Sequence, residues 1–397
     1  MKYVVVVLDG ASDYPIDMLG GKTPLEVADT PFMDSLAKAG VLGRVKTVPK
    51  GFIPSSDVAN LSLLGYDPNL YYSGRGPLEA ANLGVDLGEN DLAFRCNLIT
   101  ETDGKLADYS AGHITNKEAK ILMEHINKSL GSDKIEFFFG TSYRNLMVIR
   151  GAKELELNKL KYSAPHDIMG QDITKHMPQG NNSQIITDLI NRSKGILEGH
   201  EINKVRIDLG ENPANMIWLW GCGVKPAMPF FKKLFGLSGA VISAVDLIKG
   251  IGKIIGFEVL KVEGATGYYD TNYQGKAQAA LEAFDRVDFV FIHIEATDEA
   301  GHNQDLRMKI TCLERIDKMV VGPLVEKLRD KDFRILITPD HPTPIALRTH
   351  TDEPVPFLIA GSGIVKDELL SYSEIEAQNS SLYFDNGLDL MKYFLGK

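Results

Sequence analysis

Cysteine is scarce in this chain, and its spacing excludes the usual cysteine-based sites. The 397 residues contain three cysteines, Cys96, Cys222 and Cys312, and no Cys-x-x-Cys motif. An odd number of widely separated cysteines predicts neither a disulfide framework nor a zinc–thiolate site, and it is typical of proteins in a reducing compartment. We interpret all three as small buried apolar residues.

Long apolar runs are also missing. No segment approaches the roughly 20 apolar residues that a membrane-spanning helix requires. The first apolar run, residues 4–8, is shorter than the core of a secretion signal and stops at Asp9, so it predicts a buried strand. We therefore expect a cytoplasmic protein that does not interact with a membrane.

Positive charge is in deficit, because 43 Lys and Arg residues stand against 53 Asp and Glu residues, a formal net charge of −10. This balance argues against non-specific binding to nucleic acid or to an anionic membrane surface. The hydrophobic fraction of 44% is ordinary for a globular chain. An anionic substrate would have to be captured locally, by arginine, lysine or metal ions.

Familiar phosphate-handling motifs are incomplete. The run 250–253 resembles part of a phosphate-binding loop, but Ile254 stands where Ser or Thr is required. Ala11 replaces the second aspartate that haloacid dehalogenase-like phosphatases carry after a residue such as Asp9. No Arg-His-Gly occurs near the N-terminus, which argues against phosphohistidine chemistry.

The length predicts two domains, because single hydrophobic cores stop growing near about 250–300 residues. Short apolar runs that are expected to form strands alternate with runs at helical spacing, which predicts an α/β fold with a doubly wound, mostly parallel sheet. The expected strands are 3–8, 216–220, 257–262, 289–294 and 334–338. The expected helices include 31–39, 240–251, 276–284 and 306–328, the last broken or kinked at Pro323.

The stretch 92–205 has a different character. It is more polar, and it mixes strand-like runs at 136–139 and 146–149 with helical runs at 116–130 and 183–193. We therefore predict a smaller α+β domain, residues 92–205, inserted into a first domain that consists of residues 1–91 and 206–397.

Acidic residues and histidines follow the expected strands at their carboxyl ends. Ligands of α/β sheets gather at these ends, so we expect the residues to meet at one edge of the sheet. Mixed carboxylate and imidazole ligands suit Zn²⁺ or Mn²⁺, and six of them are about right for two metals that clamp a phosphoryl transfer. The six are Asp9, Asp298, His302, Asp340, His341 and His350.

Each of these residues has an ordinary structural explanation if it is taken alone. An aspartate after a strand is commonly a turn or cap residue, and Asp298 and His302 have the i,i+4 spacing that is also common on a solvated helix face. The metal interpretation therefore depends on the clustering of all six.

Ser56 is the candidate nucleophile. A helix is predicted to start here and to run to Leu64, and a serine at that position could simply cap free amides. The same helix terminus would also stabilise an alkoxide or a phosphoserine, and a metal on the hydroxyl would lower its pKa.

The motifs in combination resemble the archaeal-type 2,3-bisphosphoglycerate-independent phosphoglycerate mutases of the alkaline phosphatase superfamily. Ser-Ser-Asp-Val-Ala-Asn departs from the Asn-Ser-Glu-Val-Gly-His of the longer bacterial branch and is similar to the archaeal type. The resemblance covers essentially the whole chain. It rests on Val-Leu-Asp9-Gly, Pro-Ser-Ser56-Asp-Val-Ala-Asn, Gly74-Arg75-Gly-Pro-Leu-Glu-Ala, Asp298-Glu-Ala-Gly-His302, Thr338-Pro-Asp340-His341 and His350-Thr-Asp-Glu-Pro-Val-Pro356.

This resemblance implies two divalent metal ions, Mn²⁺ or Zn²⁺ first and Co²⁺ or Mg²⁺ as alternatives, and no 2,3-bisphosphoglycerate. It implies one metal on Asp298, His302 and His350. The second metal would be held by Asp9, Asp340, His341 and the Ser56 oxygen. Ser56 is preferred to Ser55 because it directly precedes the acidic residue and Val.

The resemblance further implies that the inserted domain binds the glycerate. His113 matches a histidine near the transferred phosphoryl group, and Arg144 is expected to clamp a carboxylate or phosphate. Arg75 and Lys253 are further substrate-binding candidates, although a plain surface role suits Lys253 equally well. His166 and its neighbour Asp167 are weaker candidates.

The implied activity is the interconversion of 3-phosphoglycerate and 2-phosphoglycerate through phosphoserine, an isomerase step of glycolysis and gluconeogenesis. A metal-dependent phosphomonoesterase or another phosphomutase of the superfamily stays open, because the metal ligands do not separate these activities. A non-catalytic relative is the remaining alternative, and the complete set of Ser56 and six ligands argues against it. The sequence does not indicate an oligomeric state.

Overall fold

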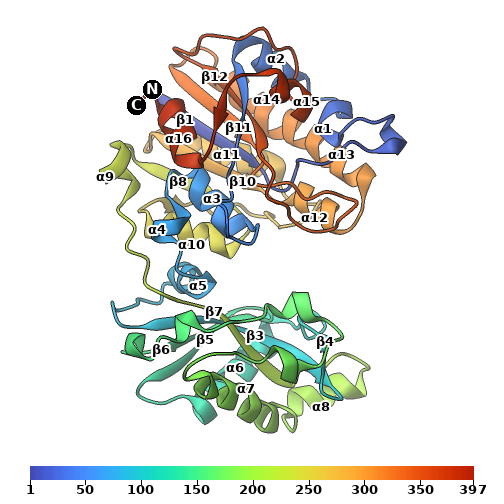
Figure 1. Cartoon of the computed structure of the whole chain (residues 1–397), viewed down its shortest axis with the longest axis vertical. Coiled ribbons are helices and arrows are strands. Elements are labelled where there is room, and N and C mark those ends of the chain that lie inside the picture. Colours follow the sequence, from blue (N-terminus) through green and yellow to red (C-terminus); the bar gives the residue numbers. More distant parts are fainter. The chain divides into compact units, whose positions relative to one another are not determined.

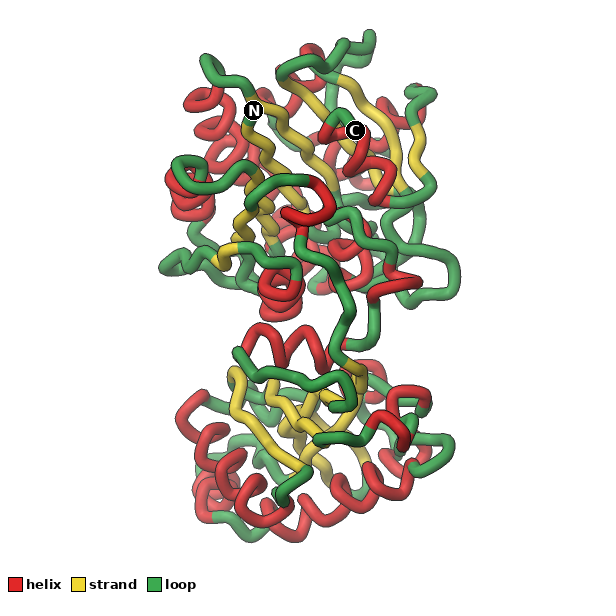
Figure 2. Tube along the Cα trace, turned by 90° about the vertical axis from the view of Figure 1, so that its left-hand side faces the viewer, coloured by secondary structure: helices red, strands yellow, loops and turns green.

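Two structural units, each built around one β-sheet, make up the chain (Figures 1 and 2). The computed structural model describes residues 1–397. Unit 1 comprises Met1–Tyr72 and Met228–Lys397, and unit 2 is the continuous segment Ser73–Ala227 inserted between them. None of the helices has both the length and the apolar character needed to cross a membrane.

The inserted unit is longer than the 92–205 that the sequence predicts. It includes α5 (Arg75–Leu83) before that range and β7 (Met216–Val224) after it. The run 216–220 is expected in the parallel sheet, but β7 pairs antiparallel with β3 (Leu92–Thr102) in unit 2. An apolar run shows that a strand is buried without identifying its partner, which is why the sequence misplaces these boundaries.

The sheet of unit 1 has eight strands in the order β13-β2-β12-β11-β1-β10-β8-β9. Neighbours from β11 to β9 pair in parallel, whereas β12 runs antiparallel to β11 and β2. The predicted α/β class with a mostly parallel sheet is confirmed. The strands are β1 (Lys2–Leu8), β2 (Val41–Val45), β8 (Gly239–Ile242), β9 (Glu258–Val259), β10 (Phe289–Ile294), β11 (Phe333–Thr338), β12 (Val355–Gly361) and β13 (Tyr383–Phe384).

The register of the three central strands brings their carboxyl ends to one level. Leu8 of β1 lies opposite Ile294 of β10, and Val7 lies opposite Thr338 of β11. The chain therefore leaves the sheet at the same edge after each strand, and the residues that follow are brought together.

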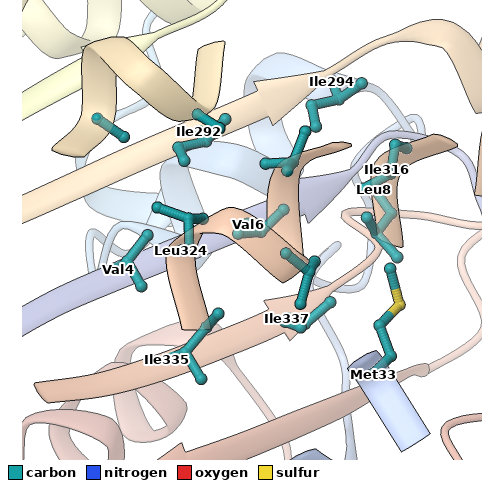
Figure 3. Close-up of a cluster of buried hydrophobic side chains, with 14 of the residues drawn as sticks. Val4, Val6, Leu8, Met33, Ile292, Ile294, Ile316, Leu324, Ile335 and Ile337 are labelled. Atoms are coloured by element: carbon teal, nitrogen blue, oxygen red, sulfur yellow. The ribbon is translucent and has the colours of Figure 1, made fainter. Parts of the chain in front are cut away.

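Alternate residues of these strands form one continuous core with the helices that cover that face (Figure 3). Branched aliphatic side chains suit a strand that is buried on both sides, and each contributes roughly 1.5–3 kcal/mol when fully buried. The core includes Val4, Val6, Leu8, Ile292, Ile294, Ile335 and Ile337 from the strands, with Met33, Ile316 and Leu324 from α2 (Pro31–Ala39), α13 (Leu306–Ile316) and α14 (Gly322–Leu328).

Helices cover both faces of the sheet in unit 1, as a doubly wound fold requires (Figure 1). On β8, Ala240 and Ile242 join the core that contains Ala277 and Ala280 of α11, whereas Val241 contacts Gly252 of α10. The helices are α1 (Pro24–Val27), α2 (Pro31–Ala39), α3 (Ser56–Leu63), α4 (Pro68–Tyr71), α9 (Phe231–Phe235), α10 (Asp246–Ile254), α11 (Tyr273–Ala283), α12 (Ala296–His302), α13 (Leu306–Ile316), α14 (Gly322–Leu328), α15 (Glu374–Asn379) and α16 (Gly387–Leu395).

Two of the predicted helices differ in the structure. The segment 240–251 is divided into β8 and α10, because its first residues pair with β10. The segment 306–328 consists of α13, a π-helical turn at Asp317–Val321 and α14, with Pro323 in the first turn of α14. Proline has no N–H to donate, and the interruption predicted at Pro323 takes the form of the π-helical turn that ends two residues before it.

Unit 2 consists of an antiparallel sheet and helices around a second core. β3 pairs with β4, β6 and β7, and β6 pairs with β5. The predicted α+β character is confirmed, including both strand-like and both helical runs. The elements, besides α5, β3 and β7, are β4 (Lys105–Asp108), α6 (Asn116–Leu130), β5 (Ile135–Thr141), β6 (Arg144–Ile149), α7 (Ser183–Leu197) and α8 (Glu201–Asp208).

Candidate two-metal centre

The aspartates and histidines predicted from the sequence converge beyond the ends of β1, β10 and β11. Asp9, Asp340 and His341 offer ligand atoms that lie within 4.8 Å of one another. Asp298, His341 and His350 form a second such group, so His341 belongs to both. The structure thus gathers these residues into one cluster in unit 1.

His302 joins this cluster from the last turn of α12. Its Nε2 atom lies 3.3 Å from Asp298 Oδ2 and 2.9 Å from His350 Nε2. His350 Nε2 lies 3.3 Å from the other Asp298 oxygen, Oδ1. Because Asp298 and His302 are four residues apart on a short helix, both side chains lie on one side of it and can reach the same position.

Gly10 allows this close approach. Its φ is +62°, and a Cβ atom at this position would lie 2.5 Å from both Asp298 Oδ1 and Thr343 Oγ1. A side chain would therefore both strain the backbone and displace the Asp298 carboxylate or the Thr343 hydroxyl.

The Nδ1 atoms of the histidines are engaged outside the cluster. His302 Nδ1 lies 2.9 Å from the Arg348 carbonyl oxygen, and His350 Nδ1 lies 3.2 Å from the Pro54 carbonyl oxygen. A carbonyl can only accept, so each Nδ1 carries a proton, and in the neutral ring the lone pair lies on Nε2, which faces the cluster. Orientation of this kind is typical of metal-binding histidines.

Ser56 is the first residue of α3, and its Oγ atom lies 3.2 Å from His341 Nε2. The neighbouring Ser55 bonds through its hydroxyl to the Ile53 carbonyl, 3.4 Å away, and makes no helix cap. The serine that precedes Asp57 is thus the one that the structure directs at the cluster.

Asn60 connects this serine to the acidic ligands, and no motif in the sequence assigns it a role. One turn after Ser56, its Nδ2 atom donates to the Ser56 carbonyl at 2.8 Å and to Asp340 Oδ2 at 2.7 Å. The other Asp340 oxygen accepts from the amides of Gly10 and His341 at 3.1 and 2.9 Å. These bonds fix the position of α3 relative to Asp340.

Asp9 lies among other acidic groups, and the histidines of the cluster do not offset the cost of ionising it. Burial raises the pKa of Asp9 well above its ordinary value, and the charges of Asp340, Asp298 and Glu295 raise it further. Burial also opposes ionisation of Asp298, but hydrogen bonds from His302 and His350 hold the pKa of Asp298 well below its usual range. A cation beside Asp9 would offset the unfavourable burial of its ionised form.

The residues fit divalent metal ions on two independent grounds. Asp9 Oδ1 is buried and makes no hydrogen bond, although it lies 3.5 Å from His341 Nε2. The donor set consists of carboxylate oxygens and imidazole nitrogens, which suits Mn²⁺ or Zn²⁺.

In unit 2, Tyr143 contacts both predicted catalytic residues of the inserted domain. The ring of His113 lies 6.3 Å from that of Tyr143, and the Arg144 guanidinium lies 5.5 Å above it. His113 has a φ of +51°, which is uncommon for a residue with a side chain and is frequent at functional sites. Arg144 Nε is buried and makes no hydrogen bond.

Arg95 is a candidate that the motifs miss. Its guanidinium and that of Arg75 each lie 5.1 Å from the ring of Trp220. Burial lowers the pKa of Arg95, although the charge of Glu79 raises it, and the charges of Arg75 and Arg144 lower it further. An arginine inside the mostly apolar first half of β3 is the signal that identifies it from sequence.

The remaining substrate candidates are placed as follows. The ring of His166 lies 5.5 Å from that of Trp220, in the same unit. Lys253 lies on α10 of unit 1, and its role in substrate binding stays a prediction.

Comparison with known proteins identifies the family. The family profile described as 2,3-bisphosphoglycerate-independent phosphoglycerate mutase matches residues 37–203. The protein of that name from Methanothrix thermoacetophila is 48% identical to this chain over 397 residues, which covers 100% of both chains. The chain belongs to this family. The family predicted from the sequence motifs is confirmed.

Further members and solved structures agree with this assignment to the mutase family. The 2,3-bisphosphoglycerate-independent phosphoglycerate mutase of Thermococcus kodakarensis is 37% identical and covers 98% of this chain and 95% of its own length. A solved structure of a Pyrococcus horikoshii protein is 33% identical, with a TM-score of 0.84 over 100% of this chain and 97% of the other. That of the cofactor-independent phosphoglycerate mutase from Thermoplasma acidophilum is 28% identical, with a TM-score of 0.67 over 100% and 99%.

Proposed function

We propose that this chain interconverts 3-phosphoglycerate and 2-phosphoglycerate, and that Ser56 carries the phosphoryl group in between. The observation that supports this most is the position of Ser56 Oγ, 3.2 Å from His341 Nε2 within a cluster of buried aspartates and histidines. The family names of the relatives supply the substrate.

We assign the metal ligands as the resemblance implies. Asp298, His302 and His350 would hold one divalent ion, and the second would be held by residues that follow β1 and β11, together with the serine oxygen. Such ions neutralise charge on the phosphoryl oxygens and lower the pKa of a coordinated hydroxyl. The ligands of the second ion are Asp9, Ser56, Asp340 and His341.

Ser56 has the surroundings that a phosphorylated side chain needs. It begins a helix of eight residues, whose free amides and dipole favour an anion at this end. Asn60 holds the first turn of this helix to Asp340, so the hydroxyl keeps one orientation during both phosphoryl transfers. Pre-organisation of this kind lowers the barrier because the groups need no rearrangement in the transition state.

We assign the glycerate part of the substrate to unit 2. Arg144 is half-buried and its buried Nε makes no hydrogen bond, and Arg75 and Arg95 flank Trp220. Guanidinium groups match carboxylates through paired hydrogen bonds. A mutase must retain the glycerate until its other hydroxyl takes the phosphoryl group back, because attack by water would make the enzyme a phosphatase.

A coupled assay tests this proposal. Metal-loaded enzyme is incubated with 3-phosphoglycerate, enolase reports 2-phosphoglycerate, and free phosphate is measured in the same reaction. We expect 2-phosphoglycerate without added 2,3-bisphosphoglycerate, loss of activity in Ser56→Ala, and retention in Ser55→Ala, the matched control. Phosphate release without 2-phosphoglycerate would instead establish a metal-dependent phosphomonoesterase, and activity in Ser56→Ala would refute the nucleophile.

A further inference from the structure

His293 is a buried histidine beside the metal ligands that no motif of the family resemblance includes. It lies on β10 opposite Val7 of β1, one residue before the strand ends. Its neighbours Ile292 and Ile294 point into the core, so the imidazole points to the opposite face of the sheet. The side chain is fully buried.

The Nε2 atom of His293 faces two of the proposed ligands. It lies 3.3 Å from Asp9 Oδ2 and 3.6 Å from Asp340 Oδ2, and it makes no hydrogen bond. The other oxygen of Asp9, Oδ1, faces His341 Nε2 at 3.5 Å. The Asp9 carboxylate therefore has one oxygen toward the proposed metal position and one toward His293.

A buried ion pair holds the imidazole in this orientation. His293 Nδ1 lies 3.3 Å from Glu295 Oε1, and Lys276 Nζ donates to Glu295 Oε2 at 2.7 Å and to the His293 carbonyl at 2.9 Å. Glu295 Oε1 also accepts from Ser243 Oγ at 2.8 Å and from the Ala244 amide at 2.7 Å. With Nδ1 engaged on this side, the ring presents Nε2 to Asp9.

A histidine is an unfavourable residue for a position that only fills the core. The residues on the same face of β10, Phe289 and Phe291, are apolar, and a buried imidazole nitrogen without a partner is unfavourable. In metal sites, by contrast, the ligating carboxylates are themselves oriented by hydrogen bonds from the surrounding shell.

We propose that His293 is a positioning residue of the second metal site. Both ring nitrogens face carboxylate oxygens, which can only accept, so both carry protons. Nδ1–H donates to Glu295, and in the metal-loaded enzyme Nε2–H donates to Asp9 Oδ2 and thereby directs Asp9 Oδ1 to the ion shared with Asp340 and His341. Glu295 and Lys276 fix the ring that does so. The inference rests on the proposed metal centre, but it is separate from the identity of the substrate.

Two amide substitutions test the position of the donor. The side-chain nitrogen of glutamine can occupy the place of histidine Nε2, whereas that of asparagine reaches only the place of Nδ1. Mn²⁺ binding to the metal-stripped full-length chain is measured by titration calorimetry without substrate. We expect His293→Asn to weaken one of the two Mn²⁺ sites by about 10–100-fold and His293→Gln to stay within a few-fold of the wild type. The other site is the internal control.

Each alternative result is informative. Unchanged Mn²⁺ affinity in His293→Asn would overturn the proposal, and equal loss in both variants would overturn it in favour of His293 as a direct ligand. The Lys276→Met/Glu295→Gln double variant leaves every proposed ligand in place and removes both buried charges together, so it replaces His293→Asn if that variant does not fold. We expect it to weaken the same site, and unchanged affinity would count against the proposal.

The outcome is distinguishable from failure of the proposed function. If all variants bind Mn²⁺ as tightly as the wild type while the wild type forms 2-phosphoglycerate, then only the role of His293 is refuted. If the variants show the expected loss but the wild type forms no 2-phosphoglycerate, then only the activity is refuted. A wild type that binds no Mn²⁺ would refute the metal centre itself.

Discussion

Replacement of Lys276 by methionine should destabilise unit 1 strongly. Lys276 Nζ lies 2.7 Å from Glu295 Oε2, and the two side chains are 0% and 4% exposed. Methionine has a similar length but no charge, so Lys276→Met leaves the Glu295 carboxylate buried without its cation. Breaking a buried pair in this way costs about 3–5 kcal/mol, which is a large part of the roughly 5–15 kcal/mol that stabilises a domain.

The partner substitution should repair most of this loss. Glu295→Gln removes the negative charge but keeps an oxygen that can accept from Ser243 Oγ and the Ala244 amide. We therefore expect the Lys276→Met/Glu295→Gln double variant to lie within about 2 kcal/mol of the wild type, and the double-mutant cycle to give a coupling energy of several kcal/mol.

The two tryptophans allow the effect to be located. Trp218 and Trp220 both lie in unit 2, so tryptophan fluorescence during urea unfolding reports on that unit. Far-UV circular dichroism reports on both units. We expect Lys276→Met to lower the unfolding midpoint by circular dichroism while the fluorescence transition stays in place. A loss below about 1 kcal/mol, or a double variant as unstable as the sum of the single variants, would refute the reasoning.

Three further predictions follow from the site and its surroundings. Arg95→Met should raise the KM for 3-phosphoglycerate about tenfold or more, because a hydrogen bond to a charged group is worth roughly 1.5–3 kcal/mol. Arg150→Met is the control, since Arg150 already pairs with Asp91 and Glu136. An equal KM in both variants would contradict the assignment of Arg95. Removal of divalent ions with EDTA should abolish mutase activity and lower the unfolding midpoint of unit 1, because Asp9 is buried among other acidic groups. Added Mn²⁺ should restore both the activity and the midpoint. Full activity after exhaustive chelation would exclude the metal mechanism. Burial raises the pKa of Asp317 from 3.8 to about 6, so the folded state binds this proton more tightly and the stabilisation is lost as the pH rises through 6. The wild type should accordingly lose about 2 kcal/mol relative to Asp317→Asn between about pH 4 and pH 6, measured by urea unfolding, and a pH-independent difference would show that the carboxyl group is not perturbed.

The sequence predicts the edge of the sheet well because the rule involved is local. Asp9, Asp298 and Asp340 each follow a short apolar run, and parallel strands deliver such residues to one edge whatever their separation in the chain. The family resemblance supplies the choice of Ser56 over Ser55, which the position of its hydroxyl near His341 supports.

Contacts between distant segments are what the sequence leaves out. Thr30 has the residue type of a helix cap, but it makes no cap hydrogen bond; the amides of Phe32 and Met33 are satisfied instead by Asp317. The run 216–220 has the pattern of a parallel strand, but its partner is β3. The sequence of each segment does not indicate its partner, Asp317 in the first case and β3 in the second.

The same limitation applies to the surroundings of the metal ligands. Lys276, His293 and Glu295 carry no motif, and their connection exists only because α11 packs beside β10. Asn60 lies in a quoted motif, yet only the folded chain shows that it joins Ser56 to Asp340.

The central place of β1 in its sheet has a consequence for biosynthesis. β1 leaves the ribosome long before its neighbours β10 and β11, which are translated about 280 and 320 residues later. At roughly 5–20 residues per second, this strand waits on the order of 15 seconds to a minute with both edges unpaired. Unit 2 is continuous and can fold during that interval. The nascent chain therefore carries an apolar segment, Val4–Leu8, that has no strand partner until the last third of the protein is made.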